Sequence, residues 1–160
     1  HLEQKGGVLT VIAGDGALKE VLRAQAARLG LKGVRFIGHQ DQTALAELFS
    51  VGDVFAMPSR TEPFGLAALE AMACGLPVVG TSAGCLVDII SPDTGALVPL
   101  EDPEALASAV EALLSIRGPQ MEALRKQCVL RVEIHFSWTA AARSTEKVYE
   151  VCLTQRQRDK

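Results

Sequence analysis

Residues 54–80 read VFAMPSRTEPFGLAALEAMACGLPVVG, and this stretch decides the fold class. The apolar run Val54–Met57 is typical of a short buried strand, and a proline stops it. Leu66–Ala73 carries apolar residues at helical spacing, and a Gly-Leu-Pro segment ends this helix before a second apolar run at Val78–Gly80. A strand, a helix and a second strand of these lengths predict a βαβ unit with parallel strands.

The same alternation extends outward in both directions along the chain. Further strands are predicted at Val8–Ala13, Val34–Ile37 and Ala96–Val98, and further helices at Ala17–Leu29, Thr43–Ser50, 103–115, 119–130 and 138–153. Val8–Ala13 is predicted to be buried, and either Thr43 or Asp41 is a suitable cap for the helix that starts there. The pattern predicts an α/β fold, a Rossmann-like three-layer α/β/α arrangement with a parallel sheet covered on both faces.

Length and composition favour one domain with an aliphatic core. The 160 residues suit a single compact unit, and residues of the apolar classes make up 48% of them while aromatic residues make up only 4%. A net charge of −3 without a basic cluster argues against nucleic acid as a partner. Apolar runs fall well short of the roughly 20 residues of a membrane span.

The four cysteines form no CxxC pair, which favours reduced, buried thiols over zinc ligands and indicates a reducing cytoplasm. The sequence begins at a histidine and enters a strand almost at once. We therefore expect residues 1–160 to be one domain from a larger two-domain protein, with a frayed tail at 155–160.

Ligands in parallel α/β sheets bind beyond the carboxyl ends of the strands. Those ends carry Gly14-Asp15-Gly16, Gly38-His39-Gln40, the loop at 58–65 and the segment Thr81-Ser82-Ala83-Gly84. The sequence therefore predicts a binding site built from these segments.

The loop before the Leu66–Ala73 helix has the chemistry of an anion site. The first amides of a helix lack internal partners and its dipole favours negative charge, so the helix start at Gly65 suits a phosphate. Glu62 lies in the loop and Glu70 lies within the helix, where a carboxylate suits the vicinal hydroxyls of a ribose. Taken singly, both acids are equally typical of a solvated surface.

The segment PSRTEPFGLAALEAMACGLPVVGTSAG (58–84) closely resembles the Glu-x7-Glu signature of retaining nucleotide-sugar glycosyltransferases with the GT-B fold, also described as group 1 or family 4. Further stretches that resemble the family are IAGDGALKEVLRAQAARLGL, VRFIGHQDQTALAELFSVGDVFAMPS, SPDTGALVPLEDPEALASAVEALL and FSWTAAARSTEKVYE. The resemblance covers residues 8–152, nearly the whole chain. It implies the donor-binding, C-terminal domain of such an enzyme.

The resemblance also implies roles for individual residues. Glu62 is similar to the acid that contacts the donor sugar and is the candidate catalytic residue. The backbone amides of Phe64, Gly65 and Leu66 are similar to those that hold the sugar hydroxyls and the distal phosphate. Glu70 is similar to the acid that binds the ribose hydroxyls.

A second group is similar to the nucleotide end of the family's site. Gly14 corresponds to the glycine near the nucleotide, and the stretch from Phe36 through Gly38 to His39 resembles the backbone edge that reads the base. For His39, a solvent-exposed loop residue is the alternative interpretation. Cys85 and Asp88 depart from the family, which has a glycine and a glutamate there.

The implied reaction is transfer of a hexose from a nucleoside-diphosphate sugar to an acceptor hydroxyl, without cofactor or metal. In the family, a preceding strand that ends in Arg and Lys, its helix and an N-terminal acceptor domain complete the site. This chain begins after them, so we expect no or little activity in isolation and self-association through the surface they leave exposed. We expect a cytoplasmic protein, with membrane attachment through the acceptor domain as an open alternative.

Other interpretations remain open at this point. A non-catalytic GT-B-like binding or scaffold module has the same fold, and a sugar-nucleotide epimerase needs acid or histidine groups at other strand ends. A generic NAD-binding domain needs a third glycine after the first strand, which Gly14-Asp15-Gly16 lacks.

Overall fold

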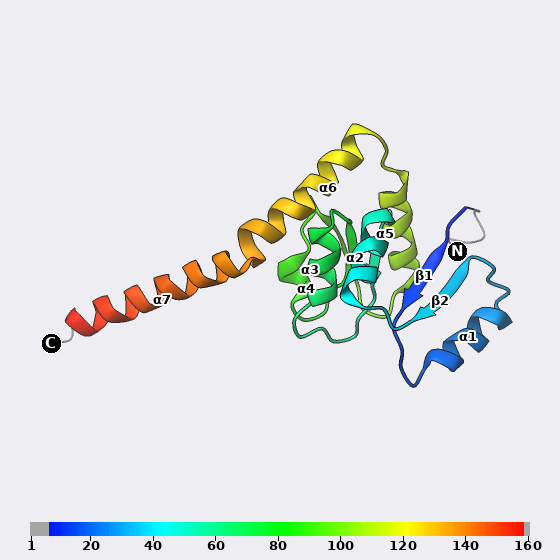
Figure 1. Ribbon diagram of the computed structural model, residues 1–160, viewed down its shortest axis with the longest axis horizontal. Coiled ribbons are helices and arrows are strands. Elements are labelled where there is room, and N and C mark those ends of the chain that lie inside the picture. The colour runs from blue at the N-terminus through cyan, green and yellow to red at the C-terminus, as the bar shows by residue number, and fades with distance from the viewer. Residues whose placement is uncertain (1–6, 159–160) are drawn as a thin grey trace.

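The computed structural model of the protein describes residues 7–158 and has an α/β architecture (Figure 1). Its strands are β1 (Thr10–Ala13), β2 (Val34–Gly38), β3 (Phe55–Met57), β4 (Val78–Thr81) and β5 (Gly95–Val98). Its helices are α1 (Lys19–Arg28), α2 (Gln42–Val51), α3 (Leu66–Ala73), α4 (Leu86–Ile89), α5 (Pro103–Ser115), α6 (Pro119–Arg131) and α7 (Trp138–Arg158), with a π-helical turn at Val132–Phe136. The short helix α4 is the only α-helix of the described residues that the sequence pattern did not indicate.

All paired strands in the described part of the chain are parallel, as predicted. They form two sheets, one of order β1-β2 and one of order β3-β4-β5. The α/β class and the Rossmann-like arrangement are therefore confirmed, while the parallel strands are divided between two sheets. One edge of β1 and one edge of β3 have no neighbouring strand among residues 7–158.

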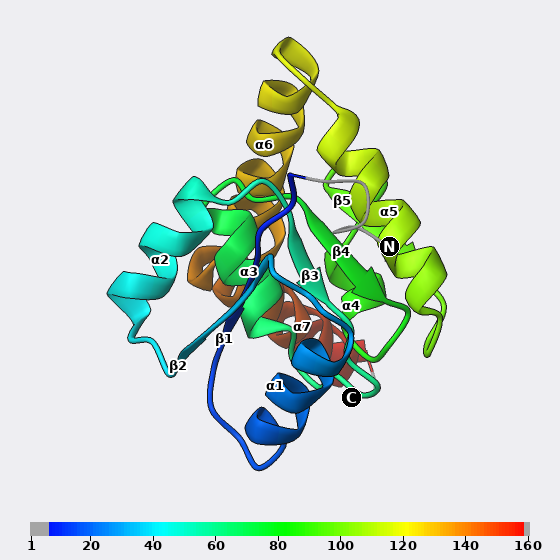
Figure 2. The same ribbon diagram turned by 90° about the vertical axis from the view of Figure 1, so that its right-hand side faces the viewer.

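The core lies around the central strand β4, all four residues of which are buried. Successive side chains of a strand point to opposite faces of the sheet. Val78 accordingly packs with residues of α3 and α4, whereas Val79 packs with residues of α5. Figure 2 shows α3 and α5 on opposite sides of the three-stranded sheet, so this sheet has the two covering layers that the sequence predicted.

The unit of β1, α1 and β2 lies at one end of the molecule and contributes little to this core (Figure 1). Three of the four residues of β1 are exposed, and α1 has no buried residue. The prediction of a buried first strand is therefore wrong. The physical reason is that β1 has a single neighbour, β2, so half of its backbone edge and most of its apolar side chains remain in contact with water.

Two aspartates cap the first turns of helices α2 and α5. The Asp41 side chain accepts a hydrogen bond from the Ala44 amide at 2.8 Å, so Asp41 and not Thr43 caps α2. Asp102 caps α5 in the same way through the Ala105 amide at 2.8 Å, and Pro103 follows at the first helical position.

The C-terminal helix α7 projects from the body as a single rod (Figure 1). It continues to Arg158, so residues 155–158 of the tail that we expected to fray are helical, and residues 159–160 lie outside the described residues. Its Trp138 is 92% exposed, so this side chain packs little against the rest of the chain.

Candidate functional site

In the loop that follows β3, the Glu62 side chain folds back and contacts backbone amides of the same loop. The half-buried Glu62 side chain accepts hydrogen bonds through Oε1 from the Gly65 amide at 2.9 Å and the Phe64 amide at 3.3 Å. The Ser59 hydroxyl donates to Oε2 at 3.4 Å. The amides that the resemblance assigned to phosphate and sugar hydroxyls thus serve a carboxylate of the same loop, which shows that this backbone geometry binds an anionic oxygen.

The start of α3 carries the remaining residues of this group. Gly65 is buried and is the N-cap of α3, whereas the side chains of Phe64 and Leu66 are 71% and 64% exposed. The amides of the first turn lack intrahelical partners, and the helix dipole adds partial positive charge at this end.

Glu70 lies in the second turn of α3 and is exposed. Among the described residues its carboxylate has no hydrogen-bond or ion-pair partner. A free carboxylate that accepts two hydrogen bonds is the group that a pair of vicinal hydroxyls requires.

The turn after β4 supports the Glu62 loop from behind. Gly84 has a φ of +50°, and a Cβ atom there would lie 2.0 Å from the carbonyl oxygen of Glu62. The Cys85 amide donates to the same carbonyl oxygen at 3.0 Å, and the Cys85 thiol donates to the carbonyl oxygen of Pro63 at 2.7 Å. The tight turn therefore forms despite the departure from the family at Cys85.

The residues that the resemblance assigned to the nucleotide lie where β1 and β2 end side by side. The Gly14 amide donates to the carbonyl oxygen of Gly38 at 2.7 Å, and the His39 amide donates to Oδ2 of Asp15 at 2.8 Å. The His39 side chain is exposed, which agrees with the alternative interpretation of a loop residue. Phe36 is half-buried, with the Arg23 guanidinium 5.7 Å from its ring centroid, so its ring packs toward α1.

The structure brings the predicted residues together as two groups and not as one. Gly14, Phe36, Gly38 and His39 belong to the two-stranded sheet, and Glu62, Phe64, Gly65, Leu66 and Glu70 follow β3 of the three-stranded sheet. Within residues 7–158, no hydrogen bond or ion pair joins the two groups.

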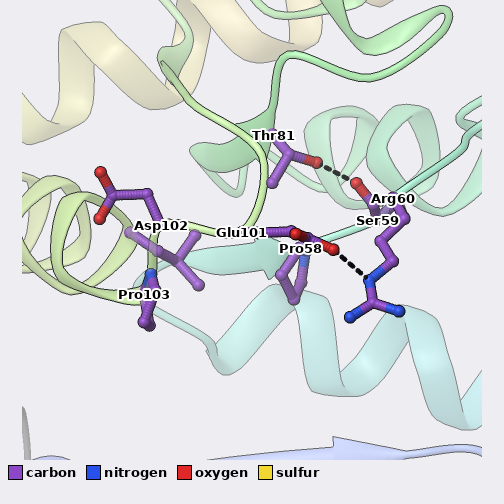
Figure 3. Close-up of a pocket in the computed structure, with 8 residues that line it drawn as sticks. Pro58, Ser59, Arg60, Thr81, Glu101, Asp102 and Pro103 are labelled. Atoms are coloured by element: carbon purple, nitrogen blue, oxygen red, sulfur yellow. Dashed lines mark hydrogen bonds and ion pairs between the residues drawn. The ribbon is translucent and has the colours of Figure 1, made fainter.

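A cleft of about 310 Å³ lies beside the Glu62 loop, at the carboxyl ends of β3, β4 and β5 (Figure 3). Its lining residues are Pro58, Ser59, Arg60, Thr81, Glu101, Asp102, Pro103 and Leu106. Arg60 Nε pairs with Glu101 Oε1 at 3.0 Å, and the Thr81 hydroxyl donates to the carbonyl oxygen of Ser59. The segments that the sequence placed at the binding site contain Pro58, Ser59, Arg60 and Thr81 but not the residues from 101 to 106, because an ion pair between residues 41 positions apart has no local pattern.

The sequence also gave no role to Asp15 and Gln40. Both contact backbone groups of the β2 end, since the Gln40 side-chain amide donates to the carbonyl oxygens of Ile37 and His39 at 2.9 Å each. A carboxylate between two glycines at a strand end was the available signal for Asp15.

No group of three or more potential metal-ligating side chains occurs among the described residues, and no helix there is both long and apolar enough to cross a bilayer. All four cysteines are free: Cys128 is buried as predicted, Cys74 and Cys85 are half-buried, and Cys152 is exposed on α7.

Parallel strands with helices between them and glycine turns at the strand ends define a Rossmann-like α/β domain. The chain belongs to the family described as glycosyl transferases group 1, which matches residues 1–129. The family resemblance seen in the sequence is therefore confirmed.

Two relatives from Mycobacterium tuberculosis illustrate the similarity. The chain is 40% identical over 134 residues to a GDP-mannose-dependent alpha-(1-6)-phosphatidylinositol dimannoside mannosyltransferase, a match that covers 84% of this chain and 33% of that protein. It is 36% identical over 146 residues to a glycogen synthase, covering 89% of this chain and 35% of that protein. The chain thus spans about a third of the length of these curated relatives.

Solved structures agree on the fold. Sucrose-phosphate synthase from Thermosynechococcus elongatus superposes with a TM-score of 0.76 at 33% identity, over 92% of this chain and 38% of that one. HepE from Anabaena, solved in complex with UDP, gives a TM-score of 0.75 at 23% identity, over 89% of this chain and 41% of that one. The second likeness supports the fold alone.

Proposed function

We propose that this chain is the donor-binding domain of a retaining hexosyltransferase that takes its sugar from a nucleoside diphosphate. The observation that carries the proposal is the Glu62 loop, whose amides already hold a carboxylate oxygen at the start of α3. In a member of this family, the same amides and the free Glu70 carboxylate are suited to the phosphate and ribose of one ligand.

Donor binding then begins with an exchange at the Phe64 and Gly65 amides. The incoming donor displaces the Glu62 carboxylate from them, and Glu62 turns toward the sugar. Because the diphosphate of the donor carries two negative charges, one on each phosphate, whereas the carboxylate carries one, it gains more from the amides and the helix dipole. The displaced Glu62 is the residue we propose to contact the sugar at the reacting centre.

Cleavage of the anomeric bond places negative charge on the leaving phosphate. Fixed donors aimed at that charge lower the barrier, because they need no reorganisation during the reaction. The first-turn amides of α3 are such donors, and we propose that they act without a metal ion or another cofactor.

In this proposal, the groups that complete the donor and acceptor sites lie outside the described residues. In a doubly wound sheet of order 3-2-1-4-5-6, the first strand lies between the second and the fourth. The two sheets β2-β1 and β3-β4-β5 correspond to the outer parts of that order, with the position of the first strand between β1 and β3. A preceding strand and its helix at that position, and an acceptor domain beyond them, complete a cytoplasmic enzyme; the isolated chain has little or no activity.

Ligand-observed NMR with UDP, GDP, ADP and their glucose and mannose conjugates tests the proposal. We expect one nucleotide family to bind, and we expect Glu70→Ala to weaken it roughly ten- to hundredfold, since a hydrogen bond to a charged group contributes about 1.5–3 kcal/mol. The matched control is Glu122→Ala, which removes an exposed carboxylate of α6 and should leave binding unchanged.

Two outcomes count against the proposal. If Glu70→Ala and Glu122→Ala bind the nucleotide equally well, Glu70 does not hold the ribose. If no nucleotide binds either this chain or the longer protein that contains it, a non-catalytic module of the same fold becomes the better explanation.

A further inference from the structure

One peptide unit at the end of β2 is held from both sides by the turn that follows β1. The carbonyl oxygen of Gly38 accepts the Gly14 amide at 2.7 Å, and the N–H of the same peptide, on His39, donates to Asp15 Oδ2 at 2.8 Å. Gly14 and Gly38 have φ angles of +122° and +74°, which side chains rarely tolerate. The orientation of this peptide is therefore set by contacts across 24 residues of sequence.

The carboxylate that holds the peptide is itself fixed. Lys19, the first residue of α1, forms an ion pair with Asp15 Oδ1, so the two carboxylate oxygens have separate partners. The hydrogen bond from Lys19 and that from the His39 amide lower the pKa of Asp15 below its ordinary value. The group is thus an ionised acceptor throughout the neutral pH range.

Gly38 fits closely against this ion pair. A Cβ atom at Gly38 would lie 3.2 Å from Asp15 Oδ2 and 3.5 Å from Lys19 Nζ. The backbone at the end of β2 therefore lies close to the Asp15 carboxylate, with no side chain between them. The peptide between Gly38 and His39 accordingly has little freedom to rotate while Asp15 is in place.

We propose that Asp15 is a positioning residue that sets which nucleobase the domain prefers, because it fixes the peptide between Gly38 and His39. This inference rests on the proposed function and on the family resemblance, which implies that the nucleobase lies against the backbone of Phe36–His39. The diphosphate belongs to the other group of residues, at the start of α3, and no hydrogen bond or ion pair between described residues links the two groups. Loss of Asp15 therefore changes base discrimination and leaves diphosphate binding intact.

The test compares Asp15→Ala with Asp15→Asn, which keeps a side-chain oxygen as acceptor for the His39 amide. Dissociation constants are measured by NMR for UDP, GDP, ADP and inorganic pyrophosphate. For Asp15→Ala we expect the ratio between the weakest and the tightest nucleotide to shrink about tenfold, equivalent to one lost hydrogen bond. We expect the pyrophosphate constant to stay within about twofold, and Asp15→Asn to recover most of the discrimination.

The matched control is Glu20→Ala on the same helix. It removes an exposed ion pair with Arg23 at 3.3 Å and touches no backbone of β2, so it should leave all four constants unchanged. Amide hydrogen exchange of His39 checks the contact without any ligand, and Asp15→Ala should accelerate it at least tenfold relative to Glu20→Ala.

Three results overturn the inference. Unchanged exchange at His39 in Asp15→Ala means that the carboxylate does not hold the peptide. Unchanged base discrimination, or an equal loss for pyrophosphate and nucleotides, means that Asp15 stabilises the turn without positioning the base. If no nucleotide binds to the unaltered chain or to the longer protein that contains it, the proposed function fails and the inference fails with it, a result distinct from intact binding with unaltered selectivity.

Discussion

At the residue scale, the candidate site depends on how closely backbone segments approach one another. Gly84 lies so near the carbonyl oxygen of Glu62 that the missing side chain is a requirement of the contact. The Glu62 carboxylate, the Phe64 and Gly65 amides and the Cys85 amide then hold each other in place. Small changes in this group are therefore expected to alter both stability and ligand binding.

Gly84→Ala tests this contact. The added Cβ meets the Glu62 carbonyl oxygen and also suffers from the positive φ, so the free energy of unfolding should fall by about 2–4 kcal/mol, the sum of backbone strain and overpacking. Nucleotide binding should weaken as well, because the Glu62 loop must move. Urea denaturation and the NMR titration measure the two effects.

Gly118→Ala is the control for Gly84→Ala. Gly118 has a similar φ of +57°, but no atom lies within 4 Å of a Cβ placed there. Gly118→Ala should cost only the backbone strain, about 1–3 kcal/mol, without any effect on binding. Equal losses in the two variants would falsify the role of the close approach.

Cys128 gives a prediction on thiol reactivity and pH. It is fully buried, its thiol donates to the Thr94 carbonyl oxygen at 3.4 Å, and burial raises its pKa from 9.0 to about 11. Between these two pH values the unfolded chain loses a proton that the folded chain keeps, so the stability contribution present below pH 9 is lost as the pH rises. The exposed Cys152 should react with a thiol reagent at pH 8 well before Cys128 does.

Mass spectrometry of the labelled protein identifies the order of reaction. Urea denaturation at pH 8 and pH 10 completes the test, with Cys128→Ala as the comparison, since that variant should lose less stability over this interval. Early labelling of Cys128 in the folded protein contradicts the prediction.

At the scale of the elements, capped helices fix the loops that form the site and the cleft. Asp102 begins α5, whose Val110 and Leu113 pack against β4 and β5 through Val79 and Val98. The same residue lines the cleft beside the Glu62 loop. The start of α5 therefore couples the packing of one face of the sheet to the geometry at its carboxyl edge.

Asp102→Ala should lower the free energy of unfolding by about 0.5–2 kcal/mol, because the Ala105 amide loses its acceptor at 2.8 Å. Asp102→Asn should lose less, since asparagine is a comparable cap. Asp53→Ala, an exposed position just before β3 with no side-chain partner among the described contacts, is the control and should change little. Thermal and urea unfolding measure all three, and a loss for Asp102→Asn as large as that for Asp102→Ala excludes the capping explanation.

At the scale of the whole molecule, the division into two sheets dominates the properties of this chain. Helices α3 and α5 cover the two faces of the three-stranded sheet (Figure 2). The unit of β1, α1 and β2, by contrast, leaves apolar side chains in water. The most exposed of these are Leu9, Leu18, Val21, Leu22 and Leu29, each at least 44% exposed. Such a concentration of apolar surface on a small unit favours association.

We therefore expect concentration-dependent self-association of the isolated chain in sedimentation-velocity experiments. Val21→Lys, which places a charge on the apolar surface of α1, should reduce it, because burial of that surface would then require burial of a charge. Glu20→Lys, at the neighbouring polar position, is the control and should leave association nearly unchanged. A monomer at every concentration would contradict the expectation.

Apart from α4 and the π-helical turn, the sequence alone determined the helices and strands of the described residues. The helix Leu66–Ala73 occurs with the bounds that its apolar spacing and its Gly-Leu-Pro ending predicted, and every strand pair is parallel, as helices between strands require. Family membership also followed from the order of the motifs. These features depend on contacts between neighbours in the chain, which a local pattern records.

Only the tertiary structure decided which groups meet. Folding of the Glu62 carboxylate onto the amides of its own loop, the hold of Asp15 on a peptide 24 residues away and the exposure of β1 have no local pattern. The reason is that burial and hydrogen-bond partners depend on which strands lie side by side, and hydrophobic alternation specifies a strand without specifying its neighbour. Val8–Ala13 reads as a buried strand, yet β1 is exposed because its second edge has no strand beside it among the described residues.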